Sequence, residues 1–340
     1  MTDPADMCAT ILDSVHGQLS IDDVWTVHDA NGFTWWPGDG VRQHVRAEGP
    51  VDVDGCATWW LSIETPVWRV GDAAGIVALE CAIEALRVRA FGAGVVTDME
   101  DGSVALVSRS YLMPETVPER CFPLAGLGAL QARLALDAWA DAEARVGDHA
   151  RAWRDARPHP IGGERIGSDE ILTLPDTAMP AIARRHGHAG LLDMWSRTGD
   201  ALATALGGEP HSQHDTLLMF GADLGRLQAS VLCGLMRGGL AGPSVAVTII
   251  LDGRYGPQDG RALCEALQRL ALEPPSLAWT LGSWVLRDRV DGTDGLMPVY
   301  GAFLPIGLFE PAYGGVLGHA IGCYLGDLRR SLQASPDLRR

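Results

Sequence analysis

The chain contains no lysine among its 340 residues, so arginine supplies every strongly basic side chain. This absence excludes enzymes that depend on a lysine Schiff base, a pyridoxal-phosphate lysine or a P-loop lysine. A genome that favours arginine codons explains the bias without a functional cause. The exclusion of these chemistries holds in either case.

Paired cysteines with metal or redox spacing are also missing. The seven cysteines are scattered, their number is odd, and no C-x-x-C occurs. This pattern predicts reduced thiols in a cytoplasmic protein rather than a disulfide framework or a zinc site. The first residues lack the basic start and apolar run of a signal peptide. Charged residues and proline interrupt the two most apolar segments, 228–251 and 304–328, so we expect no membrane-spanning helix.

Motifs for nucleophiles and cofactors are absent. There is no G-x-S-x-G elbow, and Gly126-Leu127-Gly128 lacks the third glycine of a dinucleotide loop. Two histidine pairs, His186/His188 and His211/His214, have no obvious third ligand nearby in the sequence. Zinc needs three or four ligands, so we expect neither a metal nor a cofactor. No catalytic residue is predicted, although catalytic groups can come from distant parts of a chain.

The formal net charge of −16 predicts an acidic surface. Binding to nucleic acid depends on cationic contacts to phosphate, so such a surface argues against DNA or RNA as a partner. It argues equally against anionic membranes. A basic or amphipathic protein partner is compatible with this charge.

Tryptophan is abundant where strands are expected, with six of the eleven between residues 25 and 68. The segments 24–28 and 33–36 favour a hairpin, and Asn31-Gly32 between them is typical of a tight turn with positive φ angles. Two further segments, 41–46 and 58–64, alternate apolar and polar residues as strands do.

The predicted alternation places Trp59 toward the core and Trp60 outward. The simpler interpretation is that most of these rings fill the space between sheet and helices. The functional alternative is an aromatic face that binds a partner, since tryptophan is enriched where proteins dock. Its candidate residues are Trp60, Trp36, Trp35 and Trp68.

Both halves of the chain follow one plan, and we expect an α+β fold with two similar domains. Each is predicted as an antiparallel sheet packed with helices, in the order helix, three strands, helix, hairpin, helix. The boundaries are 1–147 for the first domain, 148–180 for a proline-, glycine- and arginine-rich linker, and 181–340 for the second. Residue identity between the halves is low, and an internal duplication explains the shared order.

Glycines recur every fourth residue in the last predicted helix, at Gly314, Gly318, Gly322 and Gly326. This spacing puts them on one helix face and indicates a close approach by another element. Packing on the sheet of the same domain is one interpretation. A seam between subunits of a homo-oligomer is the other.

The order of elements resembles the type III secretion chaperone-like fold, including the related bacterial YbjN-type proteins. In the first half the segments 25–36, 58–64, 76–90, 95–111 and 124–146 carry the resemblance; in the second half 245–251, 263–272 and 279–308 carry it. The resemblance implies a small acidic homodimer that holds segments of other proteins and catalyses nothing. Since this chain is about twice as long as members of that group, its two halves could pack as a single-chain counterpart of their dimer.

These observations favour a cytoplasmic, non-enzymatic protein that holds a partner segment on an aromatic sheet face. The alternative is an enzyme or small-ligand-binding protein with a site between the two halves. A purely structural assembly component is the third possibility.

Overall fold

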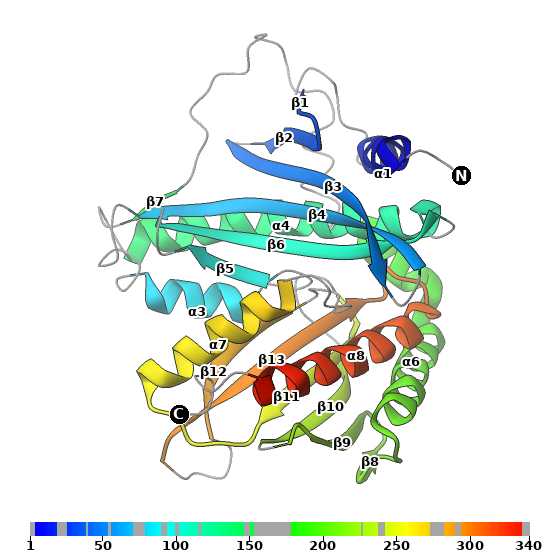
Figure 1. Cartoon of the computed structure of the whole chain (residues 1–340), viewed down its shortest axis with the longest axis vertical. Helices are drawn as coiled ribbons and strands as arrows, with labels where there is room; N and C mark the ends of the chain where they lie inside the picture. The colour runs from blue at the N-terminus through cyan, green and yellow to red at the C-terminus, as the bar shows by residue number, and fades with distance from the viewer. Residues whose placement is uncertain are drawn as a thin grey trace. The chain divides into compact units, whose positions relative to one another are not determined.

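A computed structural model of the chain divides into two compact units, Met1–Ala178 and Met179–Arg340. Each unit has an α+β fold with one antiparallel sheet (Figure 1). No helix in the described part of the chain is long and apolar enough to cross a membrane. The structure describes residues 4–18, 26–38, 40–53, 56–70, 79–89, 94–98, 102–114, 117–145, 150–152, 178–225, 227–236, 242–272, 282–289 and 294–334.

In the first unit, the described strands form a seven-stranded sheet with the order β1-β2-β3-β4-β6-β5, and β7 pairs with β4. The elements are α1 (Pro4–Gln18), β1 (Thr26–His28), β2 (Gly32–Gly38), β3 (Val41–Val53), β4 (Cys56–Val70), α3 (Glu80–Arg89), β5 (Gly94–Asp98), β6 (Ser103–Leu112), α4 (Val117–Arg145) and β7 (Ala150–Ala152).

In the second unit, the described strands form a six-stranded sheet with the order β12-β13-β11-β10-β9-β8. The elements are α6 (Ala178–Leu206), β8 (Ser212–His214), β9 (Leu217–Asp223), β10 (Gln228–Met236), β11 (Ser244–Leu251), α7 (Pro257–Leu272), β12 (Gly282–Asp288), β13 (Leu296–Pro305) and α8 (Tyr313–Ala334).

The two units share both element order and strand order. In each, four consecutive strands pair in sequence, and the fourth also pairs with the second strand of the later hairpin. The predicted α+β class with two similar halves is therefore confirmed. The predicted plan has three strands before the middle helix, whereas four are described in each unit. In the second unit the missed strand is β8, whose three residues are too few to show an alternating pattern.

The predicted linker, 148–180, contains regular structure at both ends. Residues 150–152 form β7, which pairs with β4 through Arg69 and Arg151. Helix α6 begins at Ala178. The segment between them, 153–177, lies outside the described residues.

The first hairpin does not use the predicted tight turn. Gly32 is the first residue of β2 and is not among the glycines with positive φ. The Asp29 carboxylate instead accepts a hydrogen bond from the Asn31 backbone N–H at 2.8 Å. Glycine is required at position 32 for a different reason, since a Cβ there would collide with the Val45 carbonyl on β3.

The helix-facing side of the first sheet follows the predicted alternation. Val41 and Val45 on β3 are buried, as are Leu61 and Ile63 on β4. Helices α1 and α4 pack on this side. Burial of these apolar side chains supplies the main driving force for the fold.

A buried polar network joins this side of the sheet to α4. Gln43 Nε2 donates to Thr65 Oγ1 and to the Gly128 carbonyl, each at 2.7 Å. Thr65 Oγ1 donates to Gln131 Oε1 at 2.8 Å, and Gln131 Nε2 donates to Ser108 Oγ at 2.6 Å. Such a network fixes the position of the helix, because a shift would leave several buried groups unpaired.

In the second unit, aromatic side chains hold the sheet to the helices. Trp284 of β12, Tyr300 of β13 and Tyr324 of α8 have ring centroids 5.4–6.5 Å apart. The Trp284 indole N–H donates to the Tyr324 hydroxyl at 2.6 Å, and that hydroxyl donates to the Leu267 carbonyl of α7. Burial raises the pKa of Tyr324 well above its usual range, so it remains a neutral donor.

The glycine face of α8 packs against α6 of the same unit. A Cβ at Gly318 would lie 2.5 Å from the Thr198 carbonyl, and one at Gly314 would collide with the Met194 carbonyl. The predicted close approach is thus confirmed. Its neighbour is a helix, so the expectation of packing on the sheet is wrong. Because α6 occupies Gly314, Gly318 and Gly322, a homo-oligomer seam on those glycines has no room.

Candidate functional site: a pocket beside the first hairpin

The tryptophans proposed as a binding face are mostly buried. Trp60 lies on the predicted side of β4, away from Leu61 and Ile63, but the prediction that it is exposed is wrong. It is 7% exposed, and the Arg109 guanidinium lies 5.9 Å from its ring centroid. Trp35 and Trp68 are 2% and 1% exposed, which places them in the core. Of the four candidates, only Trp36 is half-buried.

Neither histidine pair belongs to a cluster of metal ligands among the described residues. His186 and His188 flank Gly187, where α6 kinks. A Cβ at Gly221 would lie 2.7 Å from the His211 ring, and His214 Nε2 lies 3.4 Å from Ser212 Oγ. Among the described residues, no three histidine, cysteine, aspartate or glutamate side chains cluster as metal ligands would.

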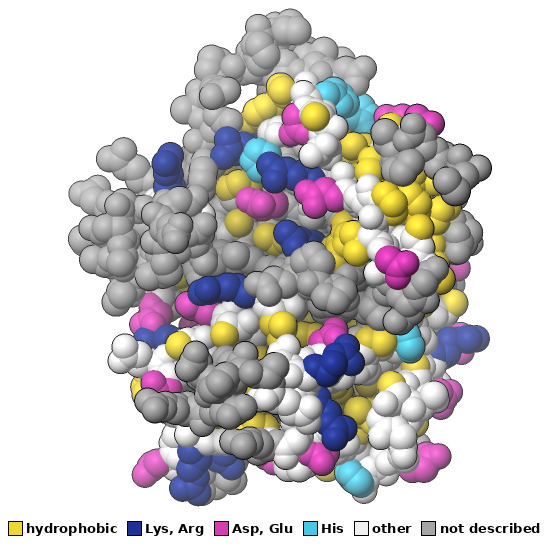
Figure 2. All heavy atoms as spheres, viewed as in Figure 1, with side chains coloured by type: hydrophobic (Ala, Val, Ile, Leu, Met, Phe, Trp, Pro, Cys, Tyr) yellow, Lys and Arg dark blue, Asp and Glu magenta, His cyan; other side chains and the backbone are white. Residues whose placement is uncertain are grey.

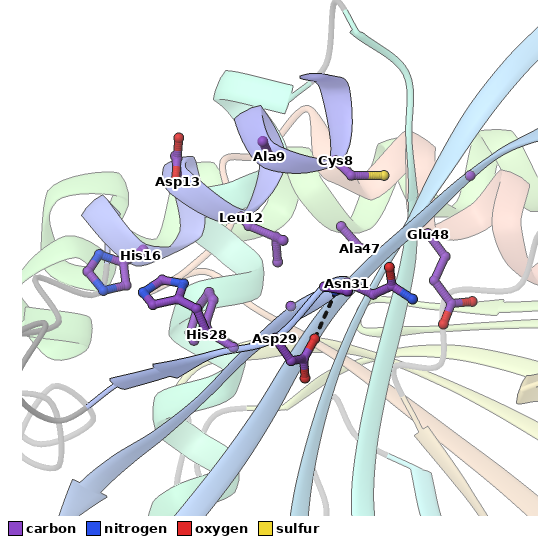
Figure 3. Close-up of a pocket in the computed structure, with 14 residues that line it drawn as sticks. Cys8, Ala9, Leu12, Asp13, His16, His28, Asp29, Asn31, Ala47 and Glu48 are labelled. Atoms are coloured by element: carbon purple, nitrogen blue, oxygen red, sulfur yellow. Dashed lines mark hydrogen bonds between the residues drawn. The ribbon is translucent and has the colours of Figure 1, made fainter. Parts of the chain in front are cut away.

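A pocket of about 560 Å³ opens in the first unit between α1, the β1–β2 hairpin and β3 (Figure 3). Its volume lies within the range of small-molecule sites. The pocket is lined by Cys8, Ala9, Leu12, Asp13, His16, His28, Asp29, Ala30, Asn31, Gly32, Phe33, Ala47, Glu48 and Gly49.

Helical spacing explains the wall formed by α1. Cys8, Leu12 and His16 are four residues apart and share one face of the helix. Ile11 and Val15, one residue before Leu12 and His16, are fully buried. The spacing of Cys8, Ile11, Leu12 and Val15 in the sequence predicts this helix. It could not show that one edge of its apolar face lines a pocket.

Three rings form one end of the pocket. The His16 and His28 ring centroids are 5.9 Å apart, and each lies within 6.0 Å of the Phe33 ring. Figure 3 shows both imidazoles in the space between α1 and the hairpin, with Leu12 directed from α1 toward the sheet. Thr26 Oγ1 lies 3.5 Å from His16 Nε2. This end therefore combines an apolar ring with two groups that can donate or accept hydrogen bonds.

The charged side chains around the pocket are acidic. Asp13, Asp29 and Glu48 are exposed and line the pocket, whereas no arginine is found among the lining residues that the structure describes. Burial, with a smaller effect from Glu48, raises the pKa of the Cys8 thiol. The pocket thus combines apolar surface with carboxylates, and their negative charge favours a cationic group.

Comparison with known proteins identifies no relative: no family model, no curated protein and no solved structure matches this chain.

Proposed function

We propose that this chain is a non-enzymatic binding protein that holds a segment of another protein, with a basic side chain of that segment in the pocket beside α1. One observation carries the proposal. The pocket combines apolar surface from Leu12 and Phe33 with three carboxylates and no described arginine. This combination supports the expectation of a basic or amphipathic partner.

The interior suits the stem of an arginine or lysine side chain. Leu12 and Phe33 offer apolar surface to its methylene groups, and the carboxylates at the exposed edge accept hydrogen bonds from its charged end. Arginine is the better fit, because its planar guanidinium can also stack on the imidazole and phenyl rings.

The backbone of the partner segment would lie along β1. This strand lies at one edge of the described sheet, and Val27 at its centre is 52% exposed. An extended segment can add to such an edge through main-chain hydrogen bonds, with side chains entering adjacent pockets. The resemblance to chaperone-like proteins that hold segments of other proteins supports a binding role.

The alternative of a small-ligand protein applies to the same pocket, with a free amine or guanidine in place of a side chain. A thiol nucleophile there is disfavoured, because the raised pKa of Cys8 leaves little thiolate at neutral pH.

Panning a displayed library of random peptides against the whole chain tests the proposal. We expect enrichment of arginine, or of lysine, at one position. A selected peptide should lose at least tenfold in affinity when citrulline, which has the same shape without the charge, replaces that arginine. Its affinity should also fall with added salt.

The matched variants are Asp13→Asn with Glu48→Gln in the pocket and Glu209→Gln on the second unit, where the side chain is exposed. Only the pocket pair should weaken binding. Equal affinity for the arginine and citrulline peptides, or equal losses in the pocket pair and the control, would refute the proposal. Agmatine binding as tightly as the peptide would favour the small-ligand alternative.

A further inference from the structure

The pocket beside α1 contains two histidines, and histidine is the side chain whose charge ordinarily changes between about pH 5 and 8. His16 comes from α1 and His28 from β1, and both line the pocket. Their ring centroids lie 5.9 Å apart, and the two imidazoles lie next to each other in Figure 3. A change of charge at these rings therefore acts on any group bound in the pocket.

The strand register explains why His28 reaches the pocket. His28 pairs with Phe33 of β2, and side chains that are directly opposite in an antiparallel pair lie on the same side of the sheet. Phe33 is 1% exposed, whereas Val27, on the other side by alternation, is 52% exposed. His28 therefore lies on the side of the hairpin that faces α1, where the helix presents His16.

The other titratable side chains that line the pocket are three carboxylates and one thiol, namely Asp13, Asp29, Glu48 and Cys8. Carboxylic acids ordinarily titrate about two pH units below histidine. Burial, with a smaller effect from Glu48, raises the pKa of Cys8, so this thiol stays neutral where histidine titrates. The two imidazoles are therefore the lining groups that we expect to change charge between about pH 5.5 and 7.5.

Both β3 and α4 pack against α1 and bring titratable groups of their own. On β3, Glu48 lines the pocket, whereas Arg46, two residues before it, does not. On α4, the Cys121 thiol interacts with Ser14 of α1, and burial raises the pKa of that thiol, so it is also neutral. With neutral imidazoles, the described lining of the pocket thus carries only negative charge.

We propose that protonation of His16 and His28 makes the pocket release its basic side chain, so that the partner segment binds at neutral pH and dissociates in mild acid. This regulation rests on the proposed binding of a basic side chain in the pocket. Two imidazolium rings would repel a guanidinium beside them and would pair with the carboxylates that attract it. Thr26 Oγ1, 3.5 Å from His16 Nε2, accommodates both states, because a hydroxyl accepts from a ring N–H and donates to a bare ring nitrogen.

The direction of the effect follows from linkage. A bound cation favours the neutral form of both rings, so affinity is full above the range in which histidine titrates and is lost as the pH falls through it. For the same reason, binding within that range should release protons from the rings. Arginine does not titrate there, so the change belongs to the protein.

Isothermal titration calorimetry of the full chain tests the inference, with the arginine peptide selected by panning and its citrulline form as probes. The peptide is chosen without histidine or acidic residues, so that it does not titrate itself. We expect the dissociation constant of the arginine peptide to rise about tenfold from pH 7.5 to pH 5.5. That of the citrulline peptide should change by less than about twofold, because it offers no charge to the imidazoles. At pH 6.5, titrations in two buffers of different ionisation enthalpy should show proton release for the arginine peptide.

The pocket variant is His16→Gln with His28→Gln, and the matched control is His186→Gln with His188→Gln on α6. The ratio of the dissociation constants at the two pH values should fall to about one in the pocket variant, because the titrating rings are gone. It should keep the wild-type value in the control. Circular dichroism at both pH values establishes that each chain is folded. If the pocket variant fails to fold, His28→Gln alone replaces it, because His28 is exposed, and it should lower the ratio.

The outcomes separate this inference from the proposed function. A dissociation constant that is the same at pH 7.5 and pH 5.5 would overturn the pH dependence and leave the binding proposal intact. So would a pocket variant that keeps the wild-type ratio. No preference for the arginine peptide over the citrulline peptide at pH 7.5 would refute the binding proposal itself, and this inference with it.

Discussion

The two sheets share a strand order and differ in the chemistry of their outer faces. On the first sheet, the side opposite α4 carries His44 and Arg46 on β3, Glu64 on β4 and Arg109 on β6. Charged side chains of both signs lie over this part of the first unit in Figure 2. On the second sheet, the corresponding side carries Met219, Leu232, Thr248 and Ile250, with Asp223 and Arg287 at opposite edges. The two sheets therefore share a strand order and differ in the residues of their outer sides.

The cores beneath these faces also differ. Trp35, Trp59 and Trp68 in the first unit bury indole N–H groups that have no hydrogen-bond partner in the described structure. In the second unit, the Trp284 indole donates to Tyr324, and Trp195 donates to the Cys233 carbonyl at 3.1 Å. An unpaired buried donor costs stability. Trp139 in the first unit is paired, since its indole N–H donates to the Val67 carbonyl. The first unit also contains the buried glutamine network of Gln43, Thr65 and Gln131.

Removing the centre of that network should have the largest effect. Gln131→Ala would leave Thr65 and Ser108 with fewer partners and open a cavity beside them, at a cost of about 3 kcal/mol. Urea unfolding monitored by hydrogen exchange in each unit is the measurement. The exposed Gln228→Ala in the second unit is the control and should cost less than about 0.5 kcal/mol. Equal destabilisation by both would show that the network adds nothing specific.

The contact between α6 and α8 should be nearly as sensitive. Gly318→Ala places a methyl group against the Thr198 carbonyl and should destabilise the second unit by about 2 kcal/mol. Gly326→Ala is matched in helix and substitution, but its nearest neighbour is Arg330 at 3.9 Å. It should stabilise the unit by up to about 1 kcal/mol. In thermal unfolding, the melting temperature should fall for Gly318→Ala and rise for Gly326→Ala.

Substituting buried tryptophans sharpens the comparison of the cores. Trp284→Phe replaces the indole by a smaller phenyl ring and leaves the Tyr324 hydroxyl without its indole donor. Trp35→Phe makes the same reduction in size, but the indole N–H that it removes has no partner in the described structure. The loss in unfolding free energy should be larger for Trp284→Phe by about 1 kcal/mol. A larger loss for Trp35→Phe in the same denaturant titration would contradict this.

The thiol in the pocket should show the smallest effect. Because burial and Glu48 raise the pKa of Cys8, its alkylation by iodoacetamide should become rapid only at a higher pH than that of an ordinary cysteine. Glu48→Gln should move that profile slightly to lower pH, since it removes the weaker of the two causes. Mass spectrometry follows Cys8 separately from the exposed Cys56, which serves as a check on the reagent. An unchanged profile in Glu48→Gln would assign the whole shift to burial.

Periodicity was enough to predict most of the elements. The alternation from Val41 to Arg46 identified β3, and the four-residue glycine spacing identified the contact face of α8. Local patterns could not show what lies across a tertiary contact. Trp60 was predicted to be exposed because alternation does not reveal the Arg109 side chain above it. Gly32 was assigned to a turn because the sequence does not show the approach of Val45.

The candidate site was harder to predict for the same reason. Its walls come from α1, the first hairpin and β3, and no motif links His16 to Glu48. Alternation and spacing report which side of an element is buried. They do not show where two packed elements leave a space between them, and a pocket forms in such a space.

The parallel arrangement of α6 and α8 has a mechanical consequence. Position 314 of α8 lies beside Met194, and position 322 lies beside Ala205, so the two helices run in the same direction. The start of α6 and the end of α8 therefore lie toward opposite ends of this helix pair. Tension between these two helix ends would load their contact in shear, instead of peeling it apart one turn at a time.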